Sequence, residues 1–378
     1  MLAKLCVAGG NSLYEEAETL LASVAELTSS GDSHYATTGL HLRALLETRK
    51  GNRAAAEQML KQSPALHDGP TAQKSQCFHY LGLLASDRGD TQAAQDLLFD
   101  AYHFATESSH QTGQAEICDS VAGLLLKLGK TNTALDFCRK SLDIKKELSD
   151  RYGTAITLGT MGRILVAQAK YSEASVAFHA DLEIARTVDD KAGIAIMLNS
   201  LANLARLQND LDEGEQLFRA SLAENESVIN QIHVLTGLSW IQLDRGDLDG
   251  ADGFIAVARW HLDQTSGLTE LSAILQGLEG ATAWRRGEYQ SAQEMLQSAN
   301  SLLRSQQHPL DTIPFLYELR DMHCAQNDMA SAVAAMSEAL DLLSASGAAR
   351  GVDDVEAWLR SVDHPRLTRV AIERCVQR

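Results

Sequence analysis

The chain has 378 residues, of which 45% are hydrophobic, and a formal net charge of −17. The apolar content is enough for a sizeable core, whereas the acidic balance disfavours direct binding to the phosphates of nucleic acids. No run of about 18 apolar residues predicts a membrane-spanning helix, and the first ten residues, MLAKLCVAGG, do not form a signal peptide. We therefore expect a cytoplasmic protein that binds neither nucleic acid directly nor a membrane.

The chain repeats itself at intervals of about 40 residues. Two copies of one unit occupy residues 151–225, where Gly153 matches Gly193 and Phe178 matches Phe218 at the same offset of 40. Self-similarity at a fixed period of this length is typical of solenoids, in which each unit contacts only its neighbours. The repeat therefore overrides the two or three ordinary domains that the length would suggest.

In chain order, each unit contains a turn that ends one helix and, five residues later, a small residue inside the next. Gly, Asn and Asp in these turns tolerate the left-handed backbone that closes a helix. Between turns the apolar residues recur at helical spacing, and no strand-like alternation occurs. The units are therefore helical hairpins, each with a helix A followed by a helix B. The small residues, spaced by 37 to 41, are Ala17, Ala56, Ala94, Ala134, Ala174, Gly214, Ala251, Ala292 and Ala332.

The pattern within the units is similar to that of the tetratricopeptide repeat (TPR). Small residues stand at its eighth position: Gly82, Ala122, Gly162, Ala202, Ser239 and Gly280. Bulky apolar residues stand near the twenty-fourth: Leu98, Phe178, Phe218, Ile255, Leu296 and Met336. The units are longer than the usual 34 residues. In this they resemble the arrays of bacterial signal-transducing ATPases, large transcriptional activators, kinesin light chains and cell-polarity adaptors. The tryptophan usual at the fourth position is absent, and HEAT or armadillo repeats, which share the 40-residue period, are the alternative.

We predict an all-α fold: a right-handed α-solenoid, or superhelix, of about nine TPR-like hairpins over residues 1–346, followed by capping or connector helices over residues 347–378. The stretch VDDVEAWLRSV predicts one C-terminal amphipathic helix, and PRLTRVAIERCVQR a second with four arginines. These helices would cap the array, as solenoids require, or connect it to an effector. The first helix A is short, which suggests a piece of a longer protein or an open N-terminus.

Motifs for chemistry are missing from the sequence. Gly129-Lys130-Thr131 lacks the first glycine of a phosphate-binding loop, since Leu124 stands in its place, and its flanks are helical. No H-E-x-x-H occurs, the twelve histidines show no ligand spacing on one helix face, and no G-x-S-x-G is present. The six cysteines form no C-x-x-C pair and are expected to be buried and reduced. We expect no enzyme, no metal and no cofactor.

The concave face of the A helices is the predicted binding site. Asn199 and Asn203 are four residues apart and share one helix face. Their amides both donate and accept hydrogen bonds, so they could grip the backbone of an extended peptide. Similar asparagine pairs in the longer-unit relatives resemble peptide clamps. The alternatives are solvated side chains or a hydrogen bond between neighbouring A helices.

The same register places an aromatic cluster and several charges on this face. Trp, Tyr and Arg are enriched at interface hot spots, and the arginines would suit an acidic segment or a carboxylate. The alternative is that one or more of the aromatics pack between neighbouring A helices. The further candidates are Trp240, Trp284, Tyr317, Arg163, Arg206, Arg285, His79 and Asp119.

The sequence thus predicts a non-enzymatic scaffold or sensor that binds a protein or peptide segment in its groove, with a homo-oligomer as a possible assembly. The alternative is a regulator that responds to an effector or a peptide signal and acts on a DNA-binding, ATPase or other signalling output domain. Small shifts in each repeat would add along the array, which suits such a switch.

Overall fold

The structure is a computed structural model that describes residues 33–49, 52–63, 69–224, 227–265, 268–306 and 308–362, together with residues 19 and 66. Every regular element in these ranges is a helix, which confirms the all-α prediction. None of the described helices is long and apolar enough to cross a membrane. The predicted first helix A and the second C-terminal helix lie outside the described residues.

The helices divide into two compact units that we describe separately. The first consists of Met1–Leu124 and Asp136–Thr154, and the second of Leu125–Leu135 and Ala155–Arg378. The helices up to the start of the second unit are α3 (Ser33–Arg49), α4 (Arg53–Lys61), α6 (Thr71–Asp87), α7 (Thr91–Glu107), α8 (Gln111–Lys127) and α9 (Thr131–Glu147).

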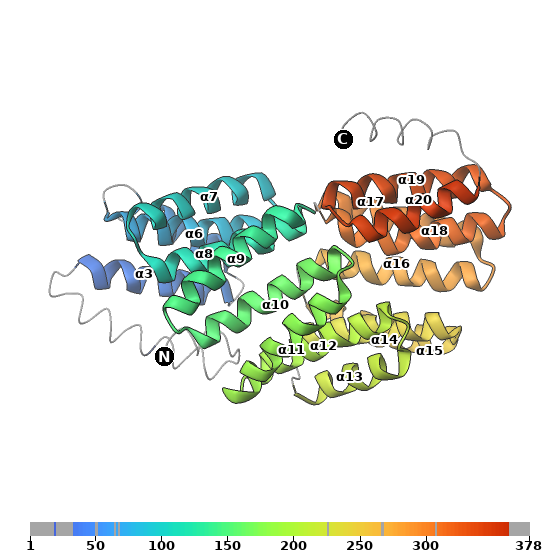
Figure 1. Ribbon diagram of the computed structural model, residues 1–378, viewed down its shortest axis with the longest axis horizontal. Coiled ribbons are helices and arrows are strands. Elements are labelled where there is room, and N and C mark those ends of the chain that lie inside the picture. The colour runs from blue at the N-terminus through green and yellow to red at the C-terminus, as the bar shows by residue number, and fades with distance from the viewer. Residues whose placement is uncertain are drawn as a thin grey trace. The chain divides into compact units, whose positions relative to one another are not determined.

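The remaining helices belong almost entirely to the second unit (Figure 1). In chain order they are α10 (Arg151–Ala167), α11 (Tyr171–Thr187), α12 (Lys191–Leu207), α13 (Leu211–Glu224), α14 (Val228–Arg245), α15 (Leu248–Asp263), α16 (Thr269–Arg285), α17 (Tyr289–Ser305), the 3₁₀ helix η1 (Pro309–Thr312), α18 (Ile313–Ala325), α19 (Met329–Ser346) and α20 (Ala349–Ser361).

The helices pair as the repeat predicts. Helices α6 and α7, α12 and α13, α14 and α15, α16 and α17, and α18 and α19 pack as hairpins. Each helix B then packs on the next helix A, as α13 does on α14 and α15 on α16. Successive A helices also touch, from α12 to α14, α16 and α18. The stack of A-then-B hairpins is therefore confirmed.

Close packing inside a hairpin explains the small residue at the eighth repeat position. A Cβ added at Gly82 would lie 2.8 Å from Cγ of Leu98, and one at Gly280 would lie 2.9 Å from Cγ of Leu296. A Cβ at Gly162 would overlap the ring of Phe178. In each case the large residue lies sixteen positions later, at the bulky apolar position, so the predicted pairing of small and large residues is the contact that holds helix B against helix A.

The turns between helices have the backbone that the sequence predicts. Gly89, Gly246 and Gly287 have φ values of 81°, 78° and 88°, and Asn209 takes the same left-handed conformation with φ of 65°. An aspartate then caps the helix that follows in several units: the carboxylate of Asp247 accepts a 3.0 Å hydrogen bond from the Gly250 amide. Such a cap satisfies one of the unpaired amides at the helix start.

The core is a series of clusters along the array instead of one central cluster. One cluster joins α14, α15 and α16 through residues such as Leu235, Ile255 and Leu275, and the next joins α16 to α19 around Phe315. At the C-terminal end Val355 and Leu359 of α20 pack on α19. Helix α20 is thus the predicted capping helix, while the domain boundary at residue 346 stays a prediction.

Candidate functional site

The asparagine pair lies on α12 in the second unit, and both side chains are half-buried. Nδ2 of Asn203 donates to the backbone carbonyl of Asn199 at 3.0 Å and lies 3.4 Å from its Oδ1. Among the described residues, neither the amide nitrogen of Asn199 nor the amide oxygen of Asn203 has a hydrogen-bond partner. The two side chains therefore share one face, as the spacing predicts, and keep a donor and an acceptor for a ligand.

Arg206, one turn after Asn203, is engaged with the next helix A. Its guanidinium donates to Asp244 on α14 at 3.0 Å, and its Cζ lies 5.3 Å from the ring of Trp240. The side chain is only 16% exposed. A cation that is paired and stacked in this way positions α12 on α14, so little of its charge is available to a ligand.

Trp240 joins three A helices. Its ring stacks on Phe315 of α18 with centroids 5.7 Å apart and planes at 30°, and it borders the core clusters on both sides of α16. This is packing between neighbouring A helices, which the sequence left as the alternative. Trp240 stays half-buried, so part of its indole still faces outward.

Trp284 and Arg285 meet on one carboxylate. Nε1 of Trp284 donates to Glu318 of α18 at 2.7 Å, and Nη2 of Arg285 donates to the same carboxylate at 3.0 Å. Arg285 also lies over the Trp284 ring, with 4.7 Å between Cζ and the centroid. Glu318 was not among the sequence candidates, and its position 33 residues from Arg285 gives no local signal.

Tyr317 and Arg163 lie at opposite ends of this row of A helices. Burial raises the pKa of the Tyr317 hydroxyl, and Cζ of Arg320 lies 5.3 Å from its ring. Arg163 of α10 is exposed, and its Nη2 lies 3.3 Å from the hydroxyl of Thr160. Eight of the ten candidates are thus on α10, α12, α14, α16 and α18, which we call the A-helix face of the second unit.

The other two candidates lie in the first unit and have internal partners. His79 is buried, its Nε2 lies 2.8 Å from the hydroxyl of Ser120, and burial lowers its pKa to about 4. Asp119 forms an ion pair with Lys145, whose side chain is only 3% exposed. These contacts join neighbouring helices inside the unit, so we do not include the two residues in the proposed binding face.

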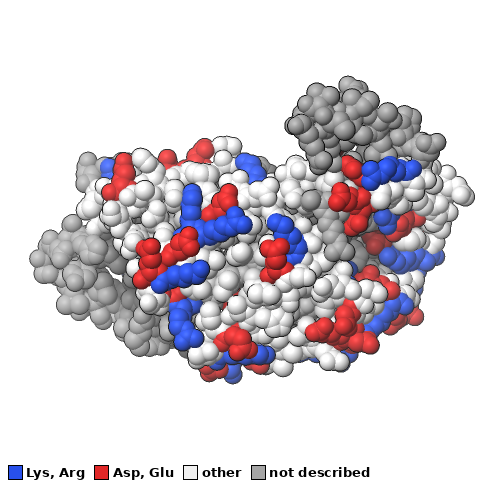
Figure 2. Space-filling view, viewed as in Figure 1, with Lys and Arg blue, Asp and Glu red and all other residues white. Residues whose placement is uncertain are grey.

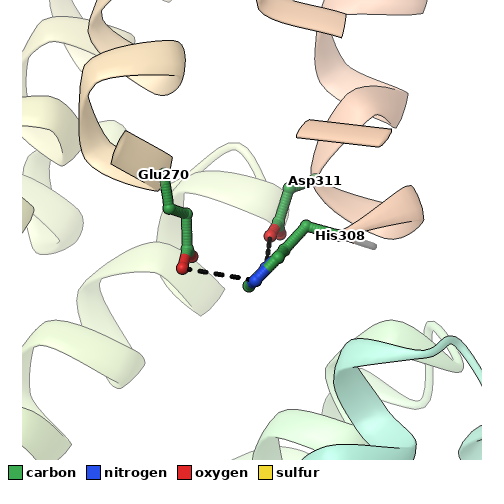
Figure 3. Close-up of side chains that lie close together, drawn as sticks. All are labelled: Glu270, His308 and Asp311. Atoms are coloured by element: carbon green, nitrogen blue, oxygen red, sulfur yellow. Dashed lines mark hydrogen bonds and ion pairs between the residues drawn. The ribbon is translucent and has the colours of Figure 1, made fainter. Parts of the chain in front are cut away.

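A histidine with two carboxylates is a cluster that sequence reasoning missed. Glu270 at the start of α16, His308 before η1, and Asp311 within η1 have ligand atoms that all lie within 4.8 Å of one another (Figure 3). The sequence search considered spacing on single helices. His308 and Asp311 are three residues apart, but Glu270 comes from a different hairpin, so only folding brings the three together.

Histidine also meets a possible nucleophile in the first unit. Nε2 of His41 lies 2.8 Å from Sγ of Cys77, and both side chains are buried. Burial lowers the pKa of His41 and raises the pKa of Cys77, so both groups are held neutral and out of reach of a substrate. Cys118 and Cys138 are buried as well, as the sequence predicts, whereas Cys6 and Cys375 lie outside the described residues.

Charge is dispersed over the surface, and the pocket geometry does not mark the A-helix face. Lys and Arg side chains lie beside Asp and Glu over the face that Figure 2 shows, without a large basic field. A shallow depression lies at the hairpin turns, lined by residues such as Lys170, Tyr171 and Gln208. We give more weight to the side chains with unused hydrogen-bonding groups than to this depression, because it contains no candidate.

No protein-family model and no curated protein matches the chain, but its fold is similar to those of solved structures. A Rap protein complexed with competence and sporulation factor has a TM-score of 0.73 at 15% identity, covering 88% of this chain and 94% of that one. NprR in complex with its cognate peptide NprX has a TM-score of 0.65 at 15% identity, with 90% and 97% covered. Aspartyl phosphate phosphatase F from Bacillus subtilis has 0.59 at 13%, with 90% of each covered. These similarities confirm the TPR-type helical-repeat fold.

Proposed function

We propose that this protein is a non-catalytic receptor that binds an extended peptide or protein segment along the A-helix face of its second unit. The observation that carries the proposal is the pair Asn199 and Asn203, half-buried on one face of α12 with a donor and an acceptor unused. A side-chain amide can accept from a peptide N–H and donate to a peptide C=O. The pair would therefore hold a peptide by its backbone, whatever its side chains.

The rest of the face supplies the chemistry for selectivity. Trp240 and Trp284 are held in fixed orientations by stacking and by the hydrogen bond to Glu318, so they offer apolar surface at a low entropic cost. Arg163 is the exposed cation on the face. A segment with an apolar residue and a carboxylate, from a side chain or a C-terminus, has the matching chemistry.

The solved structures support the ligand class. One neighbour is printed as complexed with competence and sporulation factor, and another as bound to its cognate peptide. Both structures are covered by this chain over more than nine-tenths of their length. At 15% identity the similarity concerns the fold, and the asparagine pair is what connects this chain to peptide binding.

A second candidate is a regulator in which ligand binding alters the array and thereby an output domain. The observation that favours it is the coupling of successive A helices through polar contacts on the binding face, from Arg206 to Asp244 and from Arg285 to Glu318. A ligand that competes for one of these partners would shift one repeat against the next. A neighbour with the same fold is described as a quorum sensor.

Catalysis is the less favoured function, although a neighbour is named as a phosphatase. The described pairs that combine a nucleophile with a histidine include His41 with Cys77 and His79 with Ser120. Both histidines have a pKa lowered by burial. A general base needs contact with a substrate and a pKa near the working pH, which these positions do not provide.

A peptide-display selection tests the proposal. The full chain is used to select from a random-sequence peptide library, and each enriched peptide is titrated by fluorescence anisotropy against the wild type and Asn199→Ala/Asn203→Ala. Loss of two backbone hydrogen bonds, at about 1 kcal/mol each, predicts a weakening of roughly 10- to 100-fold. The matched control is Glu183→Ala/Arg186→Ala on α11, an exposed ion pair outside the A-helix face.

The outcomes separate the proposal from its rivals. Tenfold or greater weakening in the asparagine variant, with the control unchanged, supports the receptor. Failure to enrich any peptide, or equal affinity of the wild type and the asparagine variant for every enriched peptide, rejects it. Circular dichroism of both variants shows whether the fold is retained.

A further inference from the structure

We propose that Glu270 and His308 form a binding site for a divalent transition-metal ion such as Zn²⁺, with Asp311 orienting the imidazole. The proposal departs from the expectation of no metal that the spacing of the histidines suggests, and it does not depend on peptide binding. His308 lies between the two carboxylates, one at each ring nitrogen (Figure 3).

The two ring nitrogens of His308 have different contacts. Nδ1 lies 3.1 Å from Oδ2 of Asp311, a hydrogen-bond distance, whereas Nε2 lies 3.5 Å from Oε2 of Glu270. The second distance is too long for a good N–H···O hydrogen bond. Zinc–ligand distances of about 2.0–2.2 Å in a tetrahedral site put neighbouring ligand atoms roughly 3.3–3.5 Å apart. The Glu270–His308 separation therefore fits two ligands of one ion.

The tautomer of His308 gives the same conclusion. A carboxylate only accepts hydrogen bonds, so the Nδ1–Asp311 contact places the ring proton on Nδ1. Nε2 of the neutral ring then directs a lone pair at the Glu270 carboxylate, an arrangement that is repulsive unless a positive species lies between them. A carboxylate that fixes the imidazole in this way is the usual outer partner of a metal-bound histidine.

Burial makes a bare carboxylate costly at this place. Burial raises the pKa of Glu270; His308 and Lys127 oppose that shift and Asp311 adds to it. The side chain of His308 is 12% exposed and that of Glu270 39%. A divalent ion at Nε2 would offset the desolvation of the carboxylate, and the partial exposure leaves further coordination positions for water or a ligand oxygen.

The segment that carries His308 is fixed before any ion binds. His308 precedes Pro309, which restricts its backbone, and its φ and ψ are −109° and 62°. Its amide donates to the Leu303 carbonyl at 2.9 Å, and the hydroxyl of Thr312 donates to the Pro309 carbonyl at 2.6 Å. A histidine held to the end of α17 and a glutamate in the first turn of α16 form a site that needs little rearrangement.

Titration of the untagged full chain with Zn²⁺ against a chromophoric chelator tests the proposal, with the visible spectrum of bound Co²⁺ as a second readout. We expect one saturable site per chain that His308→Ala abolishes and Glu270→Gln weakens. Asp311→Asn, which disturbs only the outer contact, should weaken binding by roughly 10- to 100-fold. The matched control is His103→Ala, because His103 forms an exposed pair with Glu107 at 3.2 Å.

Two results would overturn the site. One is the absence of a saturable 1:1 site, which would leave a proton as the species between His308 and Glu270. The other is equal affinity of the wild type, His308→Ala and Glu270→Gln, which would assign the metal to scattered surface histidines. Far-UV circular dichroism in the presence of a chelator identifies any variant that fails to fold, and Glu270→Gln keeps the shape of the side chain if His308→Ala does fail.

Discussion

Trp284 and Glu318 are joined by a 2.7 Å hydrogen bond from the indole Nε1 to the carboxylate, and the same carboxylate binds the guanidinium of Arg285. This contact fixes α16 to α18 across the A-helix face. The side chain of Glu318 is 9% exposed and that of Arg285 is 21% exposed. An ion pair that is sheltered and fully hydrogen-bonded contributes to stability mainly because loss of one partner leaves the other unpaired.

Replacing Glu318 by Gln should therefore destabilise the protein by about 2–3 kcal/mol, because hydrogen bonds to charged groups are lost and an amide N–H faces the guanidinium. The free energy of unfolding from urea titration measures the effect. The control is Glu183→Gln, whose side chain is 74% exposed beside Arg186 and which should change stability by less than about 0.5 kcal/mol. Equal stability of the two variants would show that the Trp284–Glu318 contact is not a fixed feature.

Gly162→Ala should destabilise the second unit, because the added methyl group would overlap the ring of Phe178. Overpacking of this kind costs about 1–3 kcal/mol. Gly253→Ala on α15 is the matched control, since a Cβ there meets nothing within 4 Å and alanine favours a helix over glycine by about 0.5–1 kcal/mol. Thermal unfolding should thus shift in opposite directions for the two variants, and a shift in the same direction would contradict the hairpin packing.

The buried carboxyl of Asp181 should make stability fall as the pH rises. Burial, with Asp190 adding and Arg163 opposing, raises the pKa of Asp181 to about 7. The unfolded chain releases this proton near pH 4, so between about pH 4 and pH 7 the folded state binds the proton more strongly. Stability from this group is therefore complete below pH 4 and is lost as the pH rises through 7, on the order of 4 kcal/mol in total.

Asp181→Asn removes this titration and provides the measurement. Urea unfolding at several pH values should give similar stabilities for the wild type and the variant near pH 4, and a variant that is more stable than the wild type near pH 8. Parallel curves for the two proteins across this range would exclude a raised pKa. Glu183→Gln, exposed on the same helix, should leave the pH dependence unchanged.

In the first unit, Lys145→Met should destabilise by about 3–5 kcal/mol, because Asp119 loses its partner while its side chain is only 13% exposed. The double variant Lys145→Met/Asp119→Leu should recover most of this loss, since an apolar pair of similar volume replaces a buried ion pair with little net change. A double-mutant cycle on the free energy of unfolding measures the coupling. Additive effects would mean that Asp119 is available for another role, including the ligand contact that its position on a helix A first suggested.

Much of the fold could be predicted from periodicity alone. The 40-residue repeat, the glycine and asparagine turns, and the contact between Gly162 and Phe178 are all present in the order of residues. They are predictable because each unit closes its own hairpin, and the residues that meet inside it lie within one repeat. The asparagine pair on α12 was predictable for the same reason, because a spacing of four places two side chains on one face of any helix.

The contacts between repeats were not predictable. Arg206, Trp240 and Arg285 were expected to face a ligand, but each also binds a residue of a neighbouring helix A. Their partners are Asp244, Phe315 and Glu318, which lie 33 to 75 residues away in sequence. Which side chain fills the space between two stacked A helices depends on how far one hairpin rotates on the next, and no single repeat contains that information.

The sequence by itself therefore determined the class of molecule, an all-α array of TPR-type hairpins, and the face that carries the asparagines. Only the tertiary structure decided which charges on that face are already neutralised by neighbours, and only it brought Glu270 beside His308 from hairpins 38 residues apart. The physical reason is that helix formation and hairpin closure depend on neighbours in the chain, whereas the partner of a polar side chain is set by the packing of whole hairpins against each other.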